Sequence, residues 1–281
     1  MNHLPDDILD HLQEVTGASG RYTIEEEIGR GGMGIVYAAY DHDLDRRVAL
    51  KTGKKAQEEA RMVAQLEHPG IVPIHDSGQL PDGRPFYVMK LVEGRCLDAR
   101  AAALSDRLRV FQKICDTVAF AHSRGVIHLD LKPANVMVGA FGAVFVMDWG
   151  VARRVDCPQS AGTVAGTPEY MAPEQAGGRS NERSDIYSLG VILRFLLPQK
   201  ASPALFAVAA KASAHDPGAR YGRVEDLAAD IARYLDKLAV SAYKESIPER
   251  FARFCTRNQT LLLLLAAYLL VRFFLFFLRR I

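Results

Sequence analysis

Residues 128–135 read HLDLKPAN and place three functional groups within six residues: the carboxylate of Asp130, the amine of Lys132 and the amide of Asn135. Asp130 can orient an attacking hydroxyl group and take its proton. Lys132 can neutralise negative charge on a group that is being transferred. Asn135 can contribute an oxygen ligand to a metal ion. The stretch therefore predicts a catalytic loop for group transfer.

The residues after this loop predict a strand pair, 136–138 and 144–147, joined by the turn GAFG at 139–142. Because a hairpin brings its two ends together, Asn135 and Asp148 should lie side by side. An amide oxygen and a carboxylate oxygen, with the remaining positions left to water and phosphates, suit Mg²⁺. Asn135 and Asp148 are therefore the predicted metal ligands.

A glycine-rich stretch lies upstream, where residues 28–36 read IGRGGMGIV and fit the pattern G-x-G-x-x-G-x-V. Glycines let a hairpin backbone approach phosphates closely and point its N–H groups at them. A dinucleotide-binding fold uses a similar string but requires a helix after the glycines. Here a β-like run, 35–40, follows instead. The predicted phosphate-binding residues are Gly29, Arg30, Gly31, Gly32, Met33 and Gly34.

The string VALK at 48–51 ends on Lys51, a lysine in a strand that should be buried and that therefore needs a partner. We expect Lys51 to hold the α- and β-phosphates of a nucleotide and to be held in turn by Glu59. Glu59 shares a helical face with Val63 and Leu66, whereas the alternative partner Glu58 lies on a more polar face. Only eight residues separate Lys51 from Glu59, but a chain of that length can span about 26 Å.

Strand signals dominate the first part of the chain and helical signals the second. The expected strands are 22–28, 35–41, 47–52, 71–76 and 86–91, with a helix at 56–66 among them; later helices include 105–123, 184–197 and 224–238. This order predicts an α+β fold with a small β-rich lobe and a larger, mainly helical lobe over residues 22–238. Residues 1–21 form an extension in which helical spacing predicts a short amphipathic helix.

Composition excludes several classes of protein. A net charge of +2 in 281 residues gives no general attraction to nucleic acid, so no nucleic-acid partner is expected. The four cysteines are scattered without a C-x-x-C pair, which argues against a disulfide framework or a zinc site and fits a reducing cytosol.

The C-terminal stretch 261–278 reads LLLLLAAYLLVRFFLFFL and carries one charge, Arg272. At 1.5 Å per residue its helix would be about 27 Å long, close to the hydrocarbon thickness of a bilayer. It is apolar on every face, unlike a surface helix of a soluble domain. It predicts a single transmembrane helix after a juxtamembrane segment, 239–260. The alternative is a hydrophobic helix buried against the domain or a partner.

Four further strings complete a series with the catalytic loop. They are DWG at 148–150, GTPEYMAPE at 166–174, SDIYSLG at 184–190 and DPGARY at 216–221. In this order and over nearly all of residues 22–238, the chain resembles the bacterial eukaryotic-like (Hanks-type) Ser/Thr protein kinases. The resemblance implies a two-lobed protein-kinase fold that binds ATP and Mg²⁺.

The resemblance also implies roles for further residues. Thr167 would be a substrate-docking hydroxyl in contact with Asp130, Asp185 would support the catalytic loop, and Glu174 would pair with Arg220. The nucleotide would take its adenine pocket from Val36, Ala49 and Met137, with Met89 as gatekeeper and Lys90, Leu91 and Val92 as the hinge.

Two positions depart from the family pattern. Leu129 replaces the usual arginine that receives a phosphate on the activation segment. We therefore predict activity that does not strictly depend on phosphorylation of Ser160 or Thr163. Trp149 stands where the family has phenylalanine, and its ring can fill the same apolar pocket.

The function expected from these motifs is transfer of the γ-phosphoryl group of Mg-ATP to Ser or Thr of proteins, including the kinase itself. Because ATP is cytosolic, the kinase domain should lie on the cytoplasmic side of a membrane that the C-terminal helix spans. The alternative is a pseudokinase that acts as a membrane-tethered nucleotide-binding scaffold, which the short Lys51–Glu59 spacing supports. A further alternative is a small-molecule kinase. The docking segment 166–174 argues against it, because such an enzyme would lack a segment that positions a peptide. The motifs indicate no particular protein substrate, activating stimulus or oligomeric state.

Overall fold

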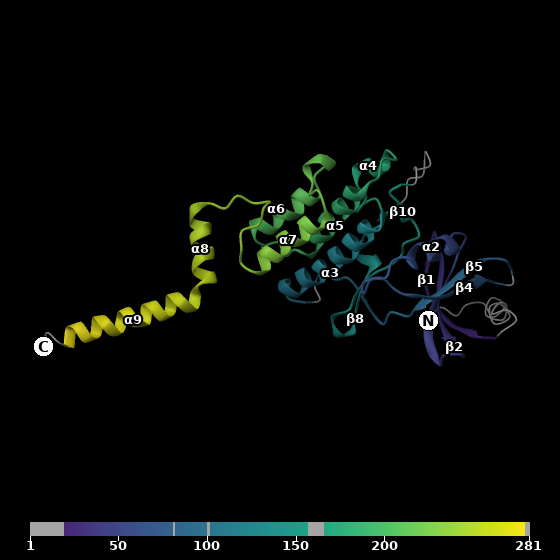
Figure 1. The fold of residues 1–281 in the computed structure, drawn as a ribbon, viewed down its shortest axis with the longest axis horizontal. Helices are drawn as coiled ribbons and strands as arrows, with labels where there is room; N and C mark the ends of the chain where they lie inside the picture. Colours follow the sequence, from purple (N-terminus) through teal and green to yellow (C-terminus); the bar gives the residue numbers. More distant parts are fainter. Residues whose placement is uncertain (1–19, 81, 100–101, 157–165, 279–281) are drawn as a thin grey trace.

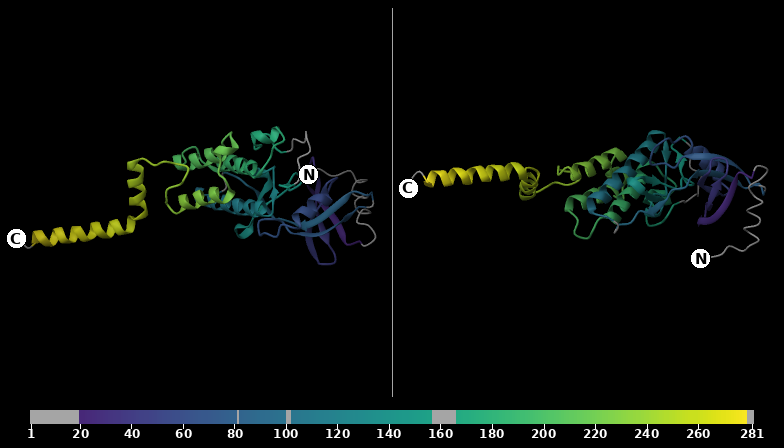
Figure 2. Two further views of the ribbon diagram at one scale, coloured as in Figure 1. Left: turned by 45° about the horizontal axis from the view of Figure 1, so that its top comes forward. Right: turned by 90° about the horizontal axis from the view of Figure 1, so that it is seen from below.

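The structure, a computed structural model, describes residues 20–80, 82–99, 102–156 and 166–278 (Figure 1). The amphipathic helix expected near the N-terminus and the candidate phosphorylation sites Ser160 and Thr163 lie outside these ranges. Two lobes make up the body of the molecule, a small one built on strands and a larger one built on helices (Figures 1 and 2). The predicted two-lobed α+β architecture is thus present.

The small lobe is a five-stranded antiparallel sheet of order β1-β2-β3-β5-β4. Its elements are β1 (Tyr22–Gly31), β2 (Gly34–Asp41), β3 (Arg46–Thr52), α2 (Ala56–Val63), β4 (Ile74–Gln79) and β5 (Pro85–Lys90). Side chains alternate across a strand, so Val48 and Leu50 enter one buried cluster while Ala49 packs in another. The same alternation places Lys51 on the face of Ala49, toward the large lobe.

The larger lobe holds most of the helices. Its elements are α3 (Leu104–Ser123), α4 (Pro173–Ala176), α5 (Glu182–Leu196), α6 (Pro203–Ala212) and α7 (Val224–Leu235), the 3₁₀ turns η2 (Pro133–Asn135), η3 (Ala140–Gly142) and η4 (Pro217–Ala219), and the short strands β6 (Gly94–Cys96), β7 (Val126–Ile127), β8 (Val136–Gly139), β9 (Val144–Val146) and β10 (Arg153–Arg154). The expected hairpin after the catalytic loop is the antiparallel pair β8–β9.

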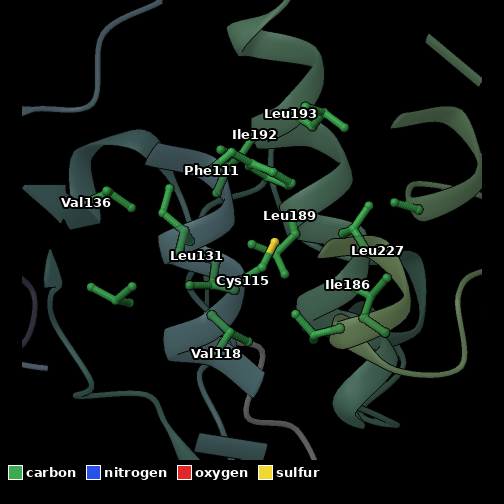
Figure 3. Close-up of a cluster of buried hydrophobic side chains, with 14 of the residues drawn as sticks. Phe111, Cys115, Val118, Leu131, Val136, Ile186, Leu189, Ile192, Leu193 and Leu227 are labelled. Carbon is green, nitrogen blue, oxygen red and sulfur yellow. The ribbon is translucent and has the colours of Figure 1, made fainter. Parts of the chain in front are cut away.

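The core of the large lobe lies between α3 and α5 (Figure 3). Phe111, Cys115 and Val118 recur at helical spacing and form the inner face of α3, all fully buried. The facing side chains of α5 are Ile186, Leu189, Ile192 and Leu193. Leu131 and Val136 enter the same cluster, so the core itself anchors the loop that carries Asp130, Lys132 and Asn135.

Element boundaries differ from the expected ones in two instructive places. β4 covers Ile74–Gln79 rather than 71–76, because Ile71 is buried in the core cluster of the large lobe and makes an isolated parallel bridge with Val146. α7 stops at Leu235 rather than residue 238, because Lys237 adopts a left-handed backbone with φ of 57°. Such a residue ends a right-handed helix.

Two helices, α8 (Ile247–Arg257) and α9 (Gln259–Leu278), stand apart from the lobes (Figures 1 and 2). Within the described residues no single helix meets the length and hydropathy expected of a membrane span. The pair Ile247–Arg257 and Gln259–Phe273, bent by 80°, meets both together. The transmembrane helix at 261–278 therefore stays a prediction.

Candidate active site

A cleft of about 950 Å³ is lined by both lobes. Its lining includes all the residues predicted to bind nucleotide: Gly29, Arg30, Gly31, Gly32, Met33, Gly34, Val36, Ala49, Lys51, Met89, Lys90, Val92 and Met137. Asp130, Lys132, Asn135 and Asp148 line the same cleft. Residues more than a hundred positions apart in sequence thus face one space.

The glycine-rich hairpin between β1 and β2 covers one side of the cleft. A Cβ atom added at Gly29, Gly31 or Gly32 would meet nothing within 4 Å. The protein's own packing therefore does not require glycine there, and the bare backbone is open to a ligand. Gly34 is different, because its φ is 145° and a Cβ atom would lie 2.0 Å from the Thr52 carbonyl oxygen. Gly34 is required by the fold of the hairpin.

Lys51 is the charged centre of the cleft. Its Nζ donates to Glu59 Oε1 at 2.8 Å and to Asp148 Oδ1 at 2.7 Å, and its side chain is only 7% exposed. Burial alone would lower the pKa of Lys51, but the two carboxylates outweigh it and the pKa is raised. Burial likewise opposes ionisation of Asp148, yet Lys51 holds its pKa below the ordinary value. Lys51 and Asp148 are therefore both charged near neutral pH.

Glu59, rather than Glu58, lies beside Lys51. Helix α2 has eight residues, and Glu59 on its inner face is buried while Glu58 is exposed. The short connection between β3 and α2 therefore still closes the ion pair. Tyr87 on β5 is buried nearby, where desolvation and the Glu59 carboxylate raise the pKa of its hydroxyl.

Asp130 and Lys132 of the catalytic loop form a triangle of hydrogen bonds with Thr167. Lys132 Nζ donates to Asp130 Oδ2 and to Thr167 Oγ1, both at 2.8 Å. Thr167 Oγ1 in turn donates to Asp130 Oδ1 at 2.9 Å. A substrate hydroxyl that replaced the Thr167 hydroxyl at Oδ1 would meet a carboxylate oxygen suited to accept its proton.

Asn135 and Asp148 lie side by side, as the hairpin predicted. The Met147 amide donates to the Asn135 carbonyl oxygen at 2.7 Å, next to Asp148, whose φ of 59° is left-handed. Asn135 Nδ2 donates to the backbone oxygen and Oδ2 of Asp130, at 2.8 and 3.0 Å. These bonds direct the amide nitrogen inward and leave its oxygen for a metal.

This donor set fits a hard divalent cation. The described residues contain no group of three or more His, Cys, Asp or Glu side chains that could hold a metal unaided. One amide and one carboxylate oxygen match an ion such as Mg²⁺, which keeps water and takes phosphate oxygens as further ligands. Asn135 and Asp148 are the residues that would hold it.

Asp185 holds the catalytic loop from below. The buried carboxylate accepts from His128 N, Leu129 N and His122 Nε2, each at 2.8 Å. Burial would raise the pKa of Asp185, but the hydrogen bonds, that from His122 first, outweigh it and the pKa is lowered. Two consecutive backbone N–H groups are thereby fixed directly before Asp130. The SDIYSLG string indicated Asp185, whereas nothing in the sequence indicated His122.

Several supporting contacts depend on the tertiary fold. Trp149 is 3% exposed, donates from Nε1 to Val146 O at 3.1 Å and lies 4.5 Å, ring to ring, from His128. It fills a buried site, as expected, and its hydrogen bond adds a tie that phenylalanine lacks. Gln175 Nε2 donates to Leu129 O at 3.0 Å, a contact the sequence did not indicate.

The expected ion pair between Glu174 and Arg220 is present and bidentate. Arg220 Nη1 and Nη2 donate to the two carboxylate oxygens at 2.7 and 2.8 Å. Burial opposes ionisation of Glu174, but hydrogen bonding to Arg220 holds its pKa below the ordinary value. The pair fastens α4, and with it the segment that carries Thr167, to the base of the large lobe.

Comparison with known proteins agrees with this geometry. A family model described as the protein kinase domain matches residues 22–211. The chain belongs to the protein kinase family. Relatives include the serine/threonine-protein kinases PknD of Chlamydia felis (34% identical over 76% of this chain and 31% of the relative), Protochlamydia amoebophila (37% over 64% and 23%) and Chlamydia pneumoniae (31% over 86% and 34%).

The predicted resemblance to bacterial Hanks-type Ser/Thr kinases is thereby confirmed at the level of the family. This kinase spans about a third of the length of the curated relatives it matches. The matched range ends at residue 211, so the predicted end of the domain at 238 stays a prediction.

Proposed function

We propose that this kinase transfers the γ-phosphoryl group of ATP, with Mg²⁺, to Ser or Thr of proteins and of itself, and that α9 anchors it in a membrane with the kinase domain in the cytoplasm. One observation carries the catalytic part: Lys51 bridges Glu59 and Asp148, 2.8 and 2.7 Å away, in the cleft that also presents Asp130.

Each residue then has a role that its position supports. Lys51 binds the α- and β-phosphates, and Asp130 orients the substrate hydroxyl and takes its proton. Lys132 neutralises charge on the transferred group, and Thr167 positions the acceptor segment. Mg²⁺, held by Asn135 and Asp148, supplies charge neutralisation at the phosphates when bound. The hydrogen bonds among these side chains keep them in place before a substrate arrives.

The pseudokinase alternative loses its main argument. It depended on the short spacing between Lys51 and Glu59, and the two charged groups nevertheless meet at 2.8 Å. A scaffold without catalysis would place no demand on the separate triangle of Asp130, Lys132 and Thr167.

Membrane anchoring is supported by the surface of α9. Large apolar side chains on several faces of this helix are more than half exposed, among them Leu264, Tyr268, Leu269 and Phe273. Exposing so continuous an apolar surface to water is energetically unfavourable, whereas contact with lipid is favourable. Arg272 Nη1 lies 3.3 Å from the Tyr268 hydroxyl, which accepts its hydrogen bond.

The test of the catalytic proposal is transfer from radiolabelled ATP. The detergent-solubilised chain, given Mg²⁺ and a generic basic acceptor protein, should label the acceptor and itself. Asp148→Asn should lose about 100-fold or more of this rate while still binding nucleotide. Asp226→Asn, on the exposed face of α7, is the matched control and should behave as the parent. Equal rates in parent and Asp148→Asn would refute the proposal.

Phosphorylation of the activation segment should be dispensable. Leu129 is 6% exposed and carries no charge that a phosphate could bind. A Ser160→Ala/Thr163→Ala double variant should therefore keep most of the parent's transfer rate in the same assay. Loss of activity in this variant, restored by Glu at either position, would contradict the prediction.

A further inference from the structure

Helix α8 presents an apolar face that nothing in the described chain covers. Ile247, Phe251 and Phe254 are 82%, 69% and 54% exposed. Their spacing places them on one face of the helix. Large apolar side chains grouped in this way mark a surface that meets another apolar phase.

Arginines flank this face. Arg250, Arg253 and Arg257 recur at the same helical spacing and, with the three apolar residues, line a shallow hollow of about 570 Å³. Arg253 donates to Glu245 at 2.8 Å. In the described part of the chain, Arg250 and Arg257 have no carboxylate within ion-pair distance. The face therefore combines apolar bulk with positive charge that is still unpaired.

The bend before α9 is built by Asn258. Its Nδ2 and backbone N both donate to Phe254 O, at 2.9 and 3.0 Å, which closes the last turn of α8. Its own carbonyl accepts from Leu262 N at 3.0 Å, which begins α9. The two helices are bent by 80°. If α9 runs along a bilayer normal, α8 lies close to the plane of the bilayer surface (Figure 1).

Hydrogen bonds connect the large lobe to the start of α8. The buried Asp230 of α7 accepts from Ser241 N and Ser241 Oγ, both at 2.7 Å, and from Ala242 N at 3.2 Å. Tyr243 OH then donates to Glu249 Oε1, in the first turn of α8, at 2.9 Å. The chain between α7 and α8 is thus bonded to α7 through Ser241 and Ala242 and to α8 through Tyr243.

We propose that α8 lies on the surface of the membrane that α9 enters. Ile247, Phe251 and Phe254 would sit at the boundary between head groups and acyl chains, and Arg250 and Arg257 would bind anionic phospholipid head groups. The proposal rests on the anchoring role given to α9 above. It makes the lipid surface a partner that orients the kinase domain.

Three probe positions test it in the full chain. Cys96, Cys157 and Cys255 are changed to Ser, Cys115 being buried, and the fluorophore NBD is attached to a single cysteine at Phe251→Cys, Thr256→Cys or Leu264→Cys. Thr256 lies on the opposite face of α8, and Leu264 lies in α9. Each protein is reconstituted into vesicles of phosphatidylcholine alone or with phosphatidylglycerol. We expect blue-shifted emission at 251 only in the anionic vesicles, aqueous emission at 256, and blue-shifted emission at 264 in both.

Charge reversal supplies the second arm. Arg250→Glu/Arg257→Glu should lower the ratio of inserted to water-exposed probe at 251 by about 30-fold or more, since each arginine near an anionic surface favours binding by about fivefold. Arg109→Glu/Arg194→Glu, at exposed positions of α3 and α5, makes the same change in net charge and should leave the ratio unchanged.

The two proposals fail in different ways. A probe at 264 that stays in water overturns the anchoring role of α9, and the α8 proposal with it. A probe buried at 264 but aqueous at 251 in both vesicle types overturns the α8 proposal alone. Burial at 251 that is equal in both lipids and falls as protein is diluted in lipid also overturns it, in favour of contact between copies.

Discussion

Replacing Asp130 by asparagine should lower the rate of phosphoryl transfer by about 10²–10⁴-fold, the usual contribution of a positioned general base. The KM for ATP should stay close to that of the parent, because Asp130 holds the acceptor side of the cleft. The measurement is steady-state transfer from radiolabelled ATP to the acceptor protein at several ATP concentrations. A loss expressed mainly in KM would assign Asp130 to nucleotide binding instead.

The substitution preserves the shape of the loop. In the parent, Lys132 and Asn135 donate to Asp130 Oδ2 at 2.8 and 3.0 Å. The side-chain oxygen of asparagine can accept the same two hydrogen bonds. Its amide nitrogen can donate to Thr167 Oγ1, which reverses the present 2.9 Å bond. The variant should therefore unfold at nearly the temperature of the parent. Asp106→Asn, exposed in the first turn of α3, controls for the loss of one negative charge and should transfer normally.

The chemistry of the cleft could be predicted because most of it is local in sequence. Asp130, Lys132 and Asn135 share one loop, and a hairpin of known geometry connects Asn135 to Asp148. A lysine in the buried strand β3 requires a partner for its charge, and the helical period of α2 favoured Glu59 over Glu58. In each case a short-range rule fixes the direction of a side chain.

Contacts between distant elements were predicted only where the family resemblance implied them, as for Glu174 with Arg220 and Thr167 with Asp130. His122 reaches Asp185 from α3, and Gln175 reaches the Leu129 carbonyl from α4. Neither residue belongs to a pattern, because each matters only once the helices are packed. The displaced start of β4 has a similar cause: Ile71 has strand-like neighbours in sequence, but burial against β9 removes it from the sheet.

The C-terminal helices show the same limit. The sequence predicts a juxtamembrane segment over 239–260 without secondary structure of its own being assigned, and in the structure 247–257 form α8. A capping box between Ser246 and Glu249 closes the start of this helix. The bend at Asn258 involves neither glycine nor proline, so no breaker residue signals it. Whether α9 crosses a membrane stays a prediction that the probe at position 264 addresses.

Asp185→Asn should produce the largest loss of stability among the substitutions considered. The carboxylate accepts three hydrogen bonds at 2.8 Å with no exposure to water. The oxygen of an amide can accept from only some of these three N–H donors. The amide nitrogen, itself a donor, would then lie against a remaining buried N–H group. The cost should be about 3 kcal/mol, or a fall of roughly 6–12 °C in the unfolding temperature for a domain of this size.

Thermal unfolding in detergent, followed by circular dichroism at a fixed scan rate, measures this loss. Asp226→Asn is the exposed counterpart and should unfold with the parent. The dependence of this stability difference on acidic pH is a second, independent test. Because folding lowers the pKa of Asp185, its contribution is complete above the ordinary carboxyl pKa and is lost as the pH falls through the lower folded value. The parent should therefore lose its advantage over Asp185→Asn on acidification below pH about 4. A difference that stayed constant down to the acid transition would mean that the ionised carboxylate is not what holds the catalytic loop.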